Sequence, residues 1–168
     1  MKRRYDREFL KDRLDAARQH IDGLVLGADV MAGFPTESEQ DFADTVDIVD
    51  RSKVIYPHVF SFSARPGTPA ARIPRQVPKM ERRRRAAILR TIGETNRRLA
   101  LKRMVGSKGC LIVERSHAVT KSNAYHGRLA NYMPVRLEDP EKASAIEVGV
   151  EIQGVSEEVL VARVSPSE

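Results

Sequence analysis

The 168-residue sequence contains a single cysteine, Cys110. One thiol cannot close a disulfide within the chain, and it cannot supply the several thiolates that hold an iron-sulfur cluster or a structural zinc ion. We therefore expect no metal site from this chain alone. Long hydrophobic runs are also missing, because no apolar stretch approaches the roughly 20 residues of a transmembrane helix. The segment after Met1 is too polar for a signal peptide, so the expected compartment is the cytoplasm, without contact with a membrane.

Excess positive charge is absent from most of the chain and concentrated in one segment. The net charge is +6, yet residues 79–104 hold ten basic and two acidic side chains, a local balance of +8 that leaves −2 for the remainder. Such a concentration is typical of a local contact with a polyanion and not of a generally basic protein. Apolar side chains recur along the segment at helical spacing, which predicts one long helix.

The first half of the chain predicts two parallel strands joined by a helix. Residues 6–20 have the spacing of an amphipathic helix. Apolar runs over 24–32 and 54–62 predict buried strands, and the segment between them predicts a helix that ends near Arg51. Parallel strands need such a crossover connection. Ligands of such sheets bind at the carboxyl ends of the strands, where each run here enters a Gly/Pro turn.

The second half predicts a linker, the long helix and a small barrel. Residues 65–78 contain four prolines and no periodicity, which predicts an ordered loop and excludes a helix. From Gly109 onward, short alternating runs predict four or five strands closed into an antiparallel β-barrel. The fold class expected is therefore α/β, with boundaries at residues 1–78, 79–105 and 106–168.

Three features at the strand ends have both a structural and a functional interpretation. The turn at residues 33–37 is either a plain connection or, through its amides and the following helix, a site for an anion. His58 is either a core histidine or a ligand-binding group. Arg65 is either a surface cation or, just past a strand end, a grip for a carboxylate or phosphate.

Two features of the sequence suggest that the chain contacts RNA. The run from Arg82 to Arg85 places positive charge around the helix, suited to a phosphate backbone, although a solvated face is the alternative. Residues 125–132 offer tyrosines that could stack on unpaired bases beside Arg128, although an ordinary barrel hairpin is the alternative.

Taken together, these residues carry a resemblance to a known family. Residues 1–5, 29–37 and 58–71, with the Gln76–Pro78 triplet, closely resemble the later part of the radical S-adenosylmethionine methylthiotransferases, and the terminal barrel resembles their TRAM domain. The branch that modifies N6-threonylcarbamoyladenosine in tRNA is the most similar, the isopentenyladenosine branch is next, and the ribosomal-protein branch is third. Thr36 stands where many members have glycine.

The resemblance implies a partial radical-SAM (TIM-like) barrel in which S-adenosylmethionine lies across the strand ends, followed by an RNA-binding barrel. The residues assigned to the cofactor are Arg3, Ala32, Gly33, Phe34, Pro35, His58, Val59, Phe60 and Arg65. The residues assigned to the anticodon stem-loop of tRNA are Arg82, Arg83, Arg84, Arg85, Arg98, Lys102, Arg103, Arg128, Asn131 and Tyr132.

The largest departure from the family is the absence of its cluster ligands. Members hold one 4Fe-4S cluster on a Cys-x3-Cys-x2-Cys loop and an auxiliary cluster on three further cysteines, and Cys110 matches none of these. The expectation is a fragment of an enzyme that adds a methylthio group to C2 of N6-threonylcarbamoyladenosine in tRNA. It has no catalytic residue of its own, is inactive alone, and requires the missing N-terminal portion as a partner. The alternatives are a non-catalytic RNA-binding module and a fragment directed at isopentenyladenosine.

Overall fold

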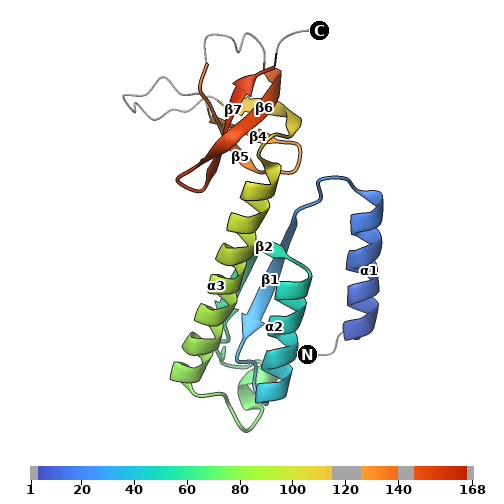
Figure 1. Ribbon diagram of the computed structural model, residues 1–168. Coiled ribbons are helices and arrows are strands. Elements are labelled where there is room, and N and C mark those ends of the chain that lie inside the picture. The colour runs from blue at the N-terminus through green and yellow to red at the C-terminus, as the bar shows by residue number, and fades with distance from the viewer. Residues whose placement is uncertain (1–3, 115–125, 140–145, 166–168) are drawn as a thin grey trace. The chain divides into compact units, whose positions relative to one another are not determined.

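The computed structural model describes residues 4–114, 126–139 and 146–165, and they form two compact units, Met1–Arg97 and Arg98–Glu168 (Figure 1). In chain order the elements are α1 (Arg7–His20), β1 (Leu26–Ala32), α2 (Glu39–Arg51), β2 (Val54–Ser61), the 3₁₀ helix η1 (Pro69–Arg72), α3 (Lys79–Met104), β3 (Lys108–Glu114), β4 (His126–Leu129), β5 (Pro134–Leu137), β6 (Glu147–Ser156) and β7 (Val159–Val164). None of the helices in the described part has the length and apolar character needed to cross a bilayer.

The first unit contains the predicted pair of parallel strands. β1 and β2 lie side by side with Val30 opposite Val59, and α2 connects them. Helices α2 and α3 supply apolar side chains to one face of this sheet. At Gly93 a Cβ would stand 2.2 Å from the ring of Pro57, so the missing side chain lets α3 approach β2 closely. The core consists of Ala32, Phe42, Val49, Val54, Val59, Ala86 and Leu89.

The opposite face of the sheet is uncovered, which corrects the prediction of a buried first strand. Burial alternates along β1 instead of being continuous. Gly27, Asp29 and Met31 are exposed, whereas the residues between them are partly buried on the core side. Because successive side chains of a strand point to opposite faces, a polar residue such as Asp29 is accommodated on the open side.

Local sequence determines where the helices of this unit begin. The Asp6 carboxylate accepts a hydrogen bond from the Phe9 amide at 2.9 Å and starts α1. Ser38 and Asp41 form a reciprocal capping box that starts α2, and the hydrogen bonds from Ser38 hold the pKa of Asp41 below its ordinary value. Thr36, in the turn before this helix, has a positive φ of 73°. That conformation favours glycine, which gives a physical reason for the glycine expected there in related sequences.

The proline-rich segment is ordered, but the exclusion of helix from it was wrong for four residues. Thr68 caps η1 by accepting from the Ala71 amide, and Pro69 occupies the first turn, where its missing N–H costs no hydrogen bond. Further along, the Arg75 carbonyl accepts from the Thr36 amide at 3.2 Å. The segment is thus tied to the turn after β1.

The second unit is a closed five-stranded barrel with the order β3-β4-β5-β7-β6. The barrel was predicted, but it is not wholly antiparallel, because β5 and β7 pair in parallel with Val135 opposite Leu160. Alternate strand residues fill the interior, and Leu111, Val135, Val150 and Leu160 are completely buried.

Candidate functional site

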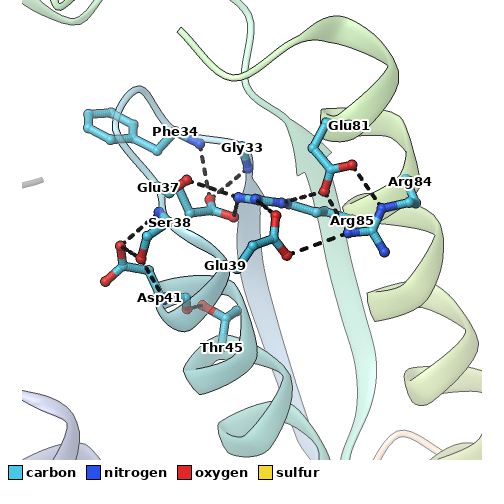
Figure 2. A network of polar contacts seen from close by, with 10 residues as sticks. All are labelled: Gly33, Phe34, Glu37, Ser38, Glu39, Asp41, Thr45, Glu81, Arg84 and Arg85. Atoms are coloured by element: carbon cyan, nitrogen blue, oxygen red, sulfur yellow. Dashed lines mark hydrogen bonds and ion pairs between the residues drawn. The ribbon is translucent and has the colours of Figure 1, made fainter. Parts of the chain in front are cut away.

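In the turn at residues 33–37, the carboxylate of Glu37 accepts hydrogen bonds from the backbone of the same turn. The Gly33 and Phe34 amides donate to Glu37 Oε2 at 2.7 and 3.1 Å (Figure 2). These two amides, at the carboxyl end of β1, were candidates for binding an external anion. In the structure Glu37 satisfies them, so the turn is held in one conformation from within the chain.

Arg85 connects this turn to α3 and is buried, with 4% of its side chain exposed. Its guanidinium donates to Glu37 Oε1 at 2.8 Å, to Glu39 Oε1 at 2.5 Å and to Glu81 Oε1 at 2.8 Å (Figure 2). Burial acts to lower the pKa of Arg85, but the hydrogen bonds to the three carboxylates outweigh it and raise that pKa. This ion-pair network corrects the prediction that Arg85 contacts RNA, because its guanidinium is buried and engaged by carboxylates of the protein itself.

The other arginines of the run have three different environments. The Arg82 stem packs on Gly33, and its Nη1 donates to the Phe62 carbonyl at 2.5 Å. Arg84 forms a bidentate pair with Glu81 at 2.7 and 2.8 Å, and hydrogen bonds from Arg84 and then Arg85 lower the pKa of Glu81 to about 2. Arg83 is exposed and has no polar partner within the described part of the chain. Of the four, Arg83 is the cation best placed for an external phosphate.

Gly33 has no room for a side chain, which makes Gly33→Ala a test of this packing. A Cβ at Gly33 would stand 2.2 Å from Arg82 Cγ, and its φ is +74°. We expect Gly33→Ala to lower the free energy of unfolding by about 2 kcal/mol, measured by urea denaturation. Gly67 is the matched control, because its φ is +80° and nothing lies within 4 Å of its Cβ position. Gly67→Ala should cost about 1 kcal/mol, and equal losses at both positions would mean that Arg82 does not constrain the turn.

The uncovered face of the sheet combines apolar side chains with one polar pair. The residues that form it are Gly27, Asp29 and Met31 of β1 and, opposite them in register, Tyr56, His58 and Phe60 of β2. Met31 and Phe60 are 39% and 44% exposed, whereas Tyr56, which is 37% exposed, has the Arg97 guanidinium of α3 over its ring at 5.5 Å from the centroid. His58 Nδ1 lies 3.3 Å from Asp29 Oδ1, and the His58 and Phe60 rings are 4.2 Å apart. The interpretation of His58 as a core histidine is therefore wrong.

The structure distributes the residues assigned to the cofactor between different environments. Ala32 is buried at the end of β1, and Gly33 and Pro35 are buried in the turn that follows. The Phe34 ring packs edge-on against Phe62 with centroids 5.5 Å apart. Val59 points into the core, whereas His58 and Phe60 lie on the uncovered face. Arg65 is exposed beyond the end of β2. Arg3 lies outside the described residues.

Sequence reasoning missed Asp29, Met31 and Tyr56 as members of this face. The sequence did indicate them, because alternate residues of a strand share a face. Pairing the two strands then places these residues beside His58 and Phe60. Because the register that brings them together links residues far apart in the chain, the pattern alone left them unassigned.

In the second unit, the residues assigned to RNA are exposed or half-buried. Arg98, Lys102 and Arg103 are exposed at the end of α3. Arg128 pairs with Glu114 at 3.2 Å and donates to the Tyr132 carbonyl at 3.4 Å. The Asn131 side chain accepts from the Met133 amide at 3.2 Å, and the Tyr132 side chain is left outward, with 73% of the residue exposed. Tyr125, the other predicted tyrosine, lies outside the described residues.

Among the described residues, no three His, Cys, Asp or Glu side chains are placed so that they could hold a metal ion. Cys110 is exposed, and its thiol donates to Glu147 Oε1 at 3.0 Å. This hydrogen bond raises the pKa of Cys110 and so disfavours the thiolate that binds metals.

Comparison with known proteins identifies relatives of two kinds. The chain is 36% identical over 135 residues to the threonylcarbamoyladenosine tRNA methylthiotransferase MtaB of Rickettsia prowazekii, covering 80% of this chain and 32% of that protein. It is 31% identical over 158 residues to the tRNA-2-methylthio-N(6)-dimethylallyladenosine synthase of Corynebacterium urealyticum, covering 89% and 29%. MtaB of Bacillus subtilis is 43% identical over 77 residues, 46% and 17% of the two chains. The chain thus spans about a third or less of these relatives, and no family profile matches it.

Proposed function

We propose that this chain, which belongs to the tRNA methylthiotransferase family, supplies one wall of an S-adenosylmethionine site and an RNA-binding surface for the methylthiolation of tRNA. The observation that carries the proposal is its 36% identity to a tRNA methylthiotransferase over 80% of its length. The proposed substrate is N6-threonylcarbamoyladenosine, modified at C2. The barrel is proposed as a TRAM domain, and the site of action as the cytoplasm.

The uncovered face and the end of β2 offer two kinds of contact that the proposed S-adenosylmethionine site would use. Phe60 and Met31 offer apolar contacts for an adenine ring, and the Arg65 guanidinium beyond the strand end would pair with the methionyl carboxylate. The Glu37 clamp on the Gly33 amide would keep the adjoining turn in place. When bound to a reduced cluster, this cofactor supplies the radical that starts the reaction.

The donor set of this chain does not fit an iron-sulfur cluster. A 4Fe-4S cluster needs several thiolates, whereas the sequence has one cysteine, and that thiol is hydrogen-bonded to Glu147. The proposal therefore assigns the cluster ligands, and with them the radical chemistry, to the N-terminal portion of the enzyme. This chain contributes cofactor and RNA contacts and is inactive without that portion.

Joining the chain to a cluster-binding portion tests the proposal. The segment of the Rickettsia prowazekii relative that precedes the matched region would be fused to this chain and expressed in a bacterium without its own tRNA methylthiotransferases. We expect mass spectrometry of digested tRNA to detect a 2-methylthio nucleoside with the fusion, and none with either part alone. A fusion that carries its clusters, shown by visible absorbance, but yields no methylthiolated nucleoside would contradict the proposal.

The second candidate is a non-catalytic RNA-binding module. It is favoured by the exposed Lys102, Arg103 and Tyr132, which need no cofactor to contact RNA. Under this alternative the isolated chain binds an anticodon stem-loop, and the fusion produces no modified nucleoside. The fusion experiment thus separates the two candidates.

A further inference from the structure

We infer that the Asp29–His58 pair recognises the substituent on N6 of the substrate adenosine and favours a polar substituent over a hydrocarbon one. The inference rests on the proposed function and extends it to substrate choice. The two kinds of relative have names that differ in this substituent, which is threonylcarbamoyl in one and dimethylallyl in the other. A group on this chain that contacts the substituent would therefore separate the two substrates.

The pair is fixed by strand register. Asp29 and His58 are directly opposite each other in the parallel ladder, and both are on the face that α2 and α3 leave open. Because an ionised carboxylate can only accept, the 3.3 Å contact has His58 Nδ1–H donating to Asp29 Oδ1. Asp29 therefore acts as a positioning residue that orients the imidazole and leaves Nε2 for a ligand.

The pair is accessible and has apolar neighbours. The His58 and Asp29 side chains are 73% and 80% exposed, so a ligand can reach them. Phe60 stands 4.2 Å from the imidazole ring, and Met31 is opposite Phe60 in register. The proposed function places the cofactor adenine on these apolar side chains, so only the N6 substituent of the substrate base is taken to meet the imidazole.

The chemistry of the two substituents separates them at such a site. Threonylcarbamoyl carries a hydroxyl and ureido N–H groups, each of which can donate a hydrogen bond to His58 Nε2, which accepts when Nδ1 carries the proton. Dimethylallyl is a hydrocarbon, so it would remove water from the imidazole and give no hydrogen bond in return. A site with a polar group to satisfy rejects the ligand that leaves that group unpaired.

The test measures nucleoside binding to the full chain by the NMR signals of its histidine rings. N6-threonylcarbamoyladenosine and N6-dimethylallyladenosine would be titrated separately into the wild type and into His58→Phe. We expect the wild type to bind the threonylcarbamoyl nucleoside at least about tenfold more tightly, a difference typical of one hydrogen bond to a polar ligand. The His58 signal should shift with saturation, and His58→Phe should bring the affinity ratio close to one.

Two further variants separate recognition from folding. His58→Gln keeps a side-chain hydrogen bond and should retain part of the preference, while Asp29→Ala should reduce it by removing the acceptor that orients the imidazole. A preference that survives in His58→Phe, or binding of neither nucleoside by the wild type, would overturn the inference. The fusion experiment decides the methylthiotransferase proposal separately, because it detects modification of either nucleoside.

Discussion

Arg85→Met is expected to lower the free energy of unfolding by about 4 kcal/mol, because it removes one partner of a buried ionic network. Arg85 neutralises Glu37, whose side chain is only 11% exposed. Methionine keeps a flexible stem next to Phe42, over which the guanidinium now lies at 5.2 Å from the ring centroid. The loss of stability should therefore come mainly from leaving the Glu37 carboxylate without its ion-pair partner, and less from a cavity. Urea denaturation followed by circular dichroism measures it.

Arg83→Met is the matched control for this prediction. It removes the same charge from the adjacent position of α3, but Arg83 is exposed, so the expected change is within about 0.5 kcal/mol. Equal effects at both positions would show that net charge, and not the network, is responsible.

The Arg85→Met deficit should also depend on pH. Glu81 has a pKa lowered to about 2 from its ordinary 4.5, by hydrogen bonds from Arg84 first and Arg85 second. A lowered pKa stabilises the fold above pH 4.5, and that contribution is lost as pH falls toward 2. The difference in stability between wild type and variant should therefore narrow over this interval. A difference that stays constant would contradict an ionic origin.

The sequence predicted the fold well where the controlling interactions are local. The bounds of α3 depend on the periodicity of apolar side chains along one helix. Positions that depend on distant partners were not predictable. The parallel pairing of β5 with β7 is one example, because short alternating runs carry no information about strand order.

Within the run from Arg82 to Arg85, the environment of Arg85 also depends on distant partners and could not be predicted from the sequence. Consecutive helical residues are about 100° apart, so four arginines in a row cannot all face solvent on one side. The sequence thus implies that one faces the fold, but not that Arg85 meets Glu37 and Glu39, more than forty residues earlier. The Asp29–His58 pair likewise depends on the register of two strands.

Tyr132→Ala is expected to weaken binding of an anticodon stem-loop by roughly 5- to 150-fold, the range for loss of one base-stacking aromatic ring. Tyr132 is 73% exposed, and its backbone carbonyl is held by Arg128, so the ring is presented to solvent from an anchored turn. Stacking involves no counterion release. The loss should therefore be the same at low and high salt, as measured by fluorescence anisotropy with labelled RNA.

The double variant Lys102→Ser with Arg103→Ser should weaken binding of the same stem-loop by an amount that depends on salt concentration, unlike Tyr132→Ala. Each phosphate contact that is removed should reduce the slope of log affinity against log salt by about 0.7 for a single strand. Two lost contacts therefore reduce the slope by about 1.4. Both side chains are exposed and have no polar partner in the described part of the chain.

The control for this double variant removes two arginines that are already paired. Arg84→Ser with Arg163→Ser changes the net charge equally, but Arg84 is held by Glu81 and Arg163 by Glu138 at 2.8 Å. A smaller change of slope in this control would show that RNA contacts Lys102 and Arg103 locally. Equal changes would show that net charge alone governs binding, and a Tyr132→Ala loss that disappears at high salt would exclude stacking. Because the double variant alters the slope of log affinity against log salt and Tyr132→Ala alters only the affinity at every salt concentration, the phosphate and stacking contributions to the proposed RNA binding can be measured independently.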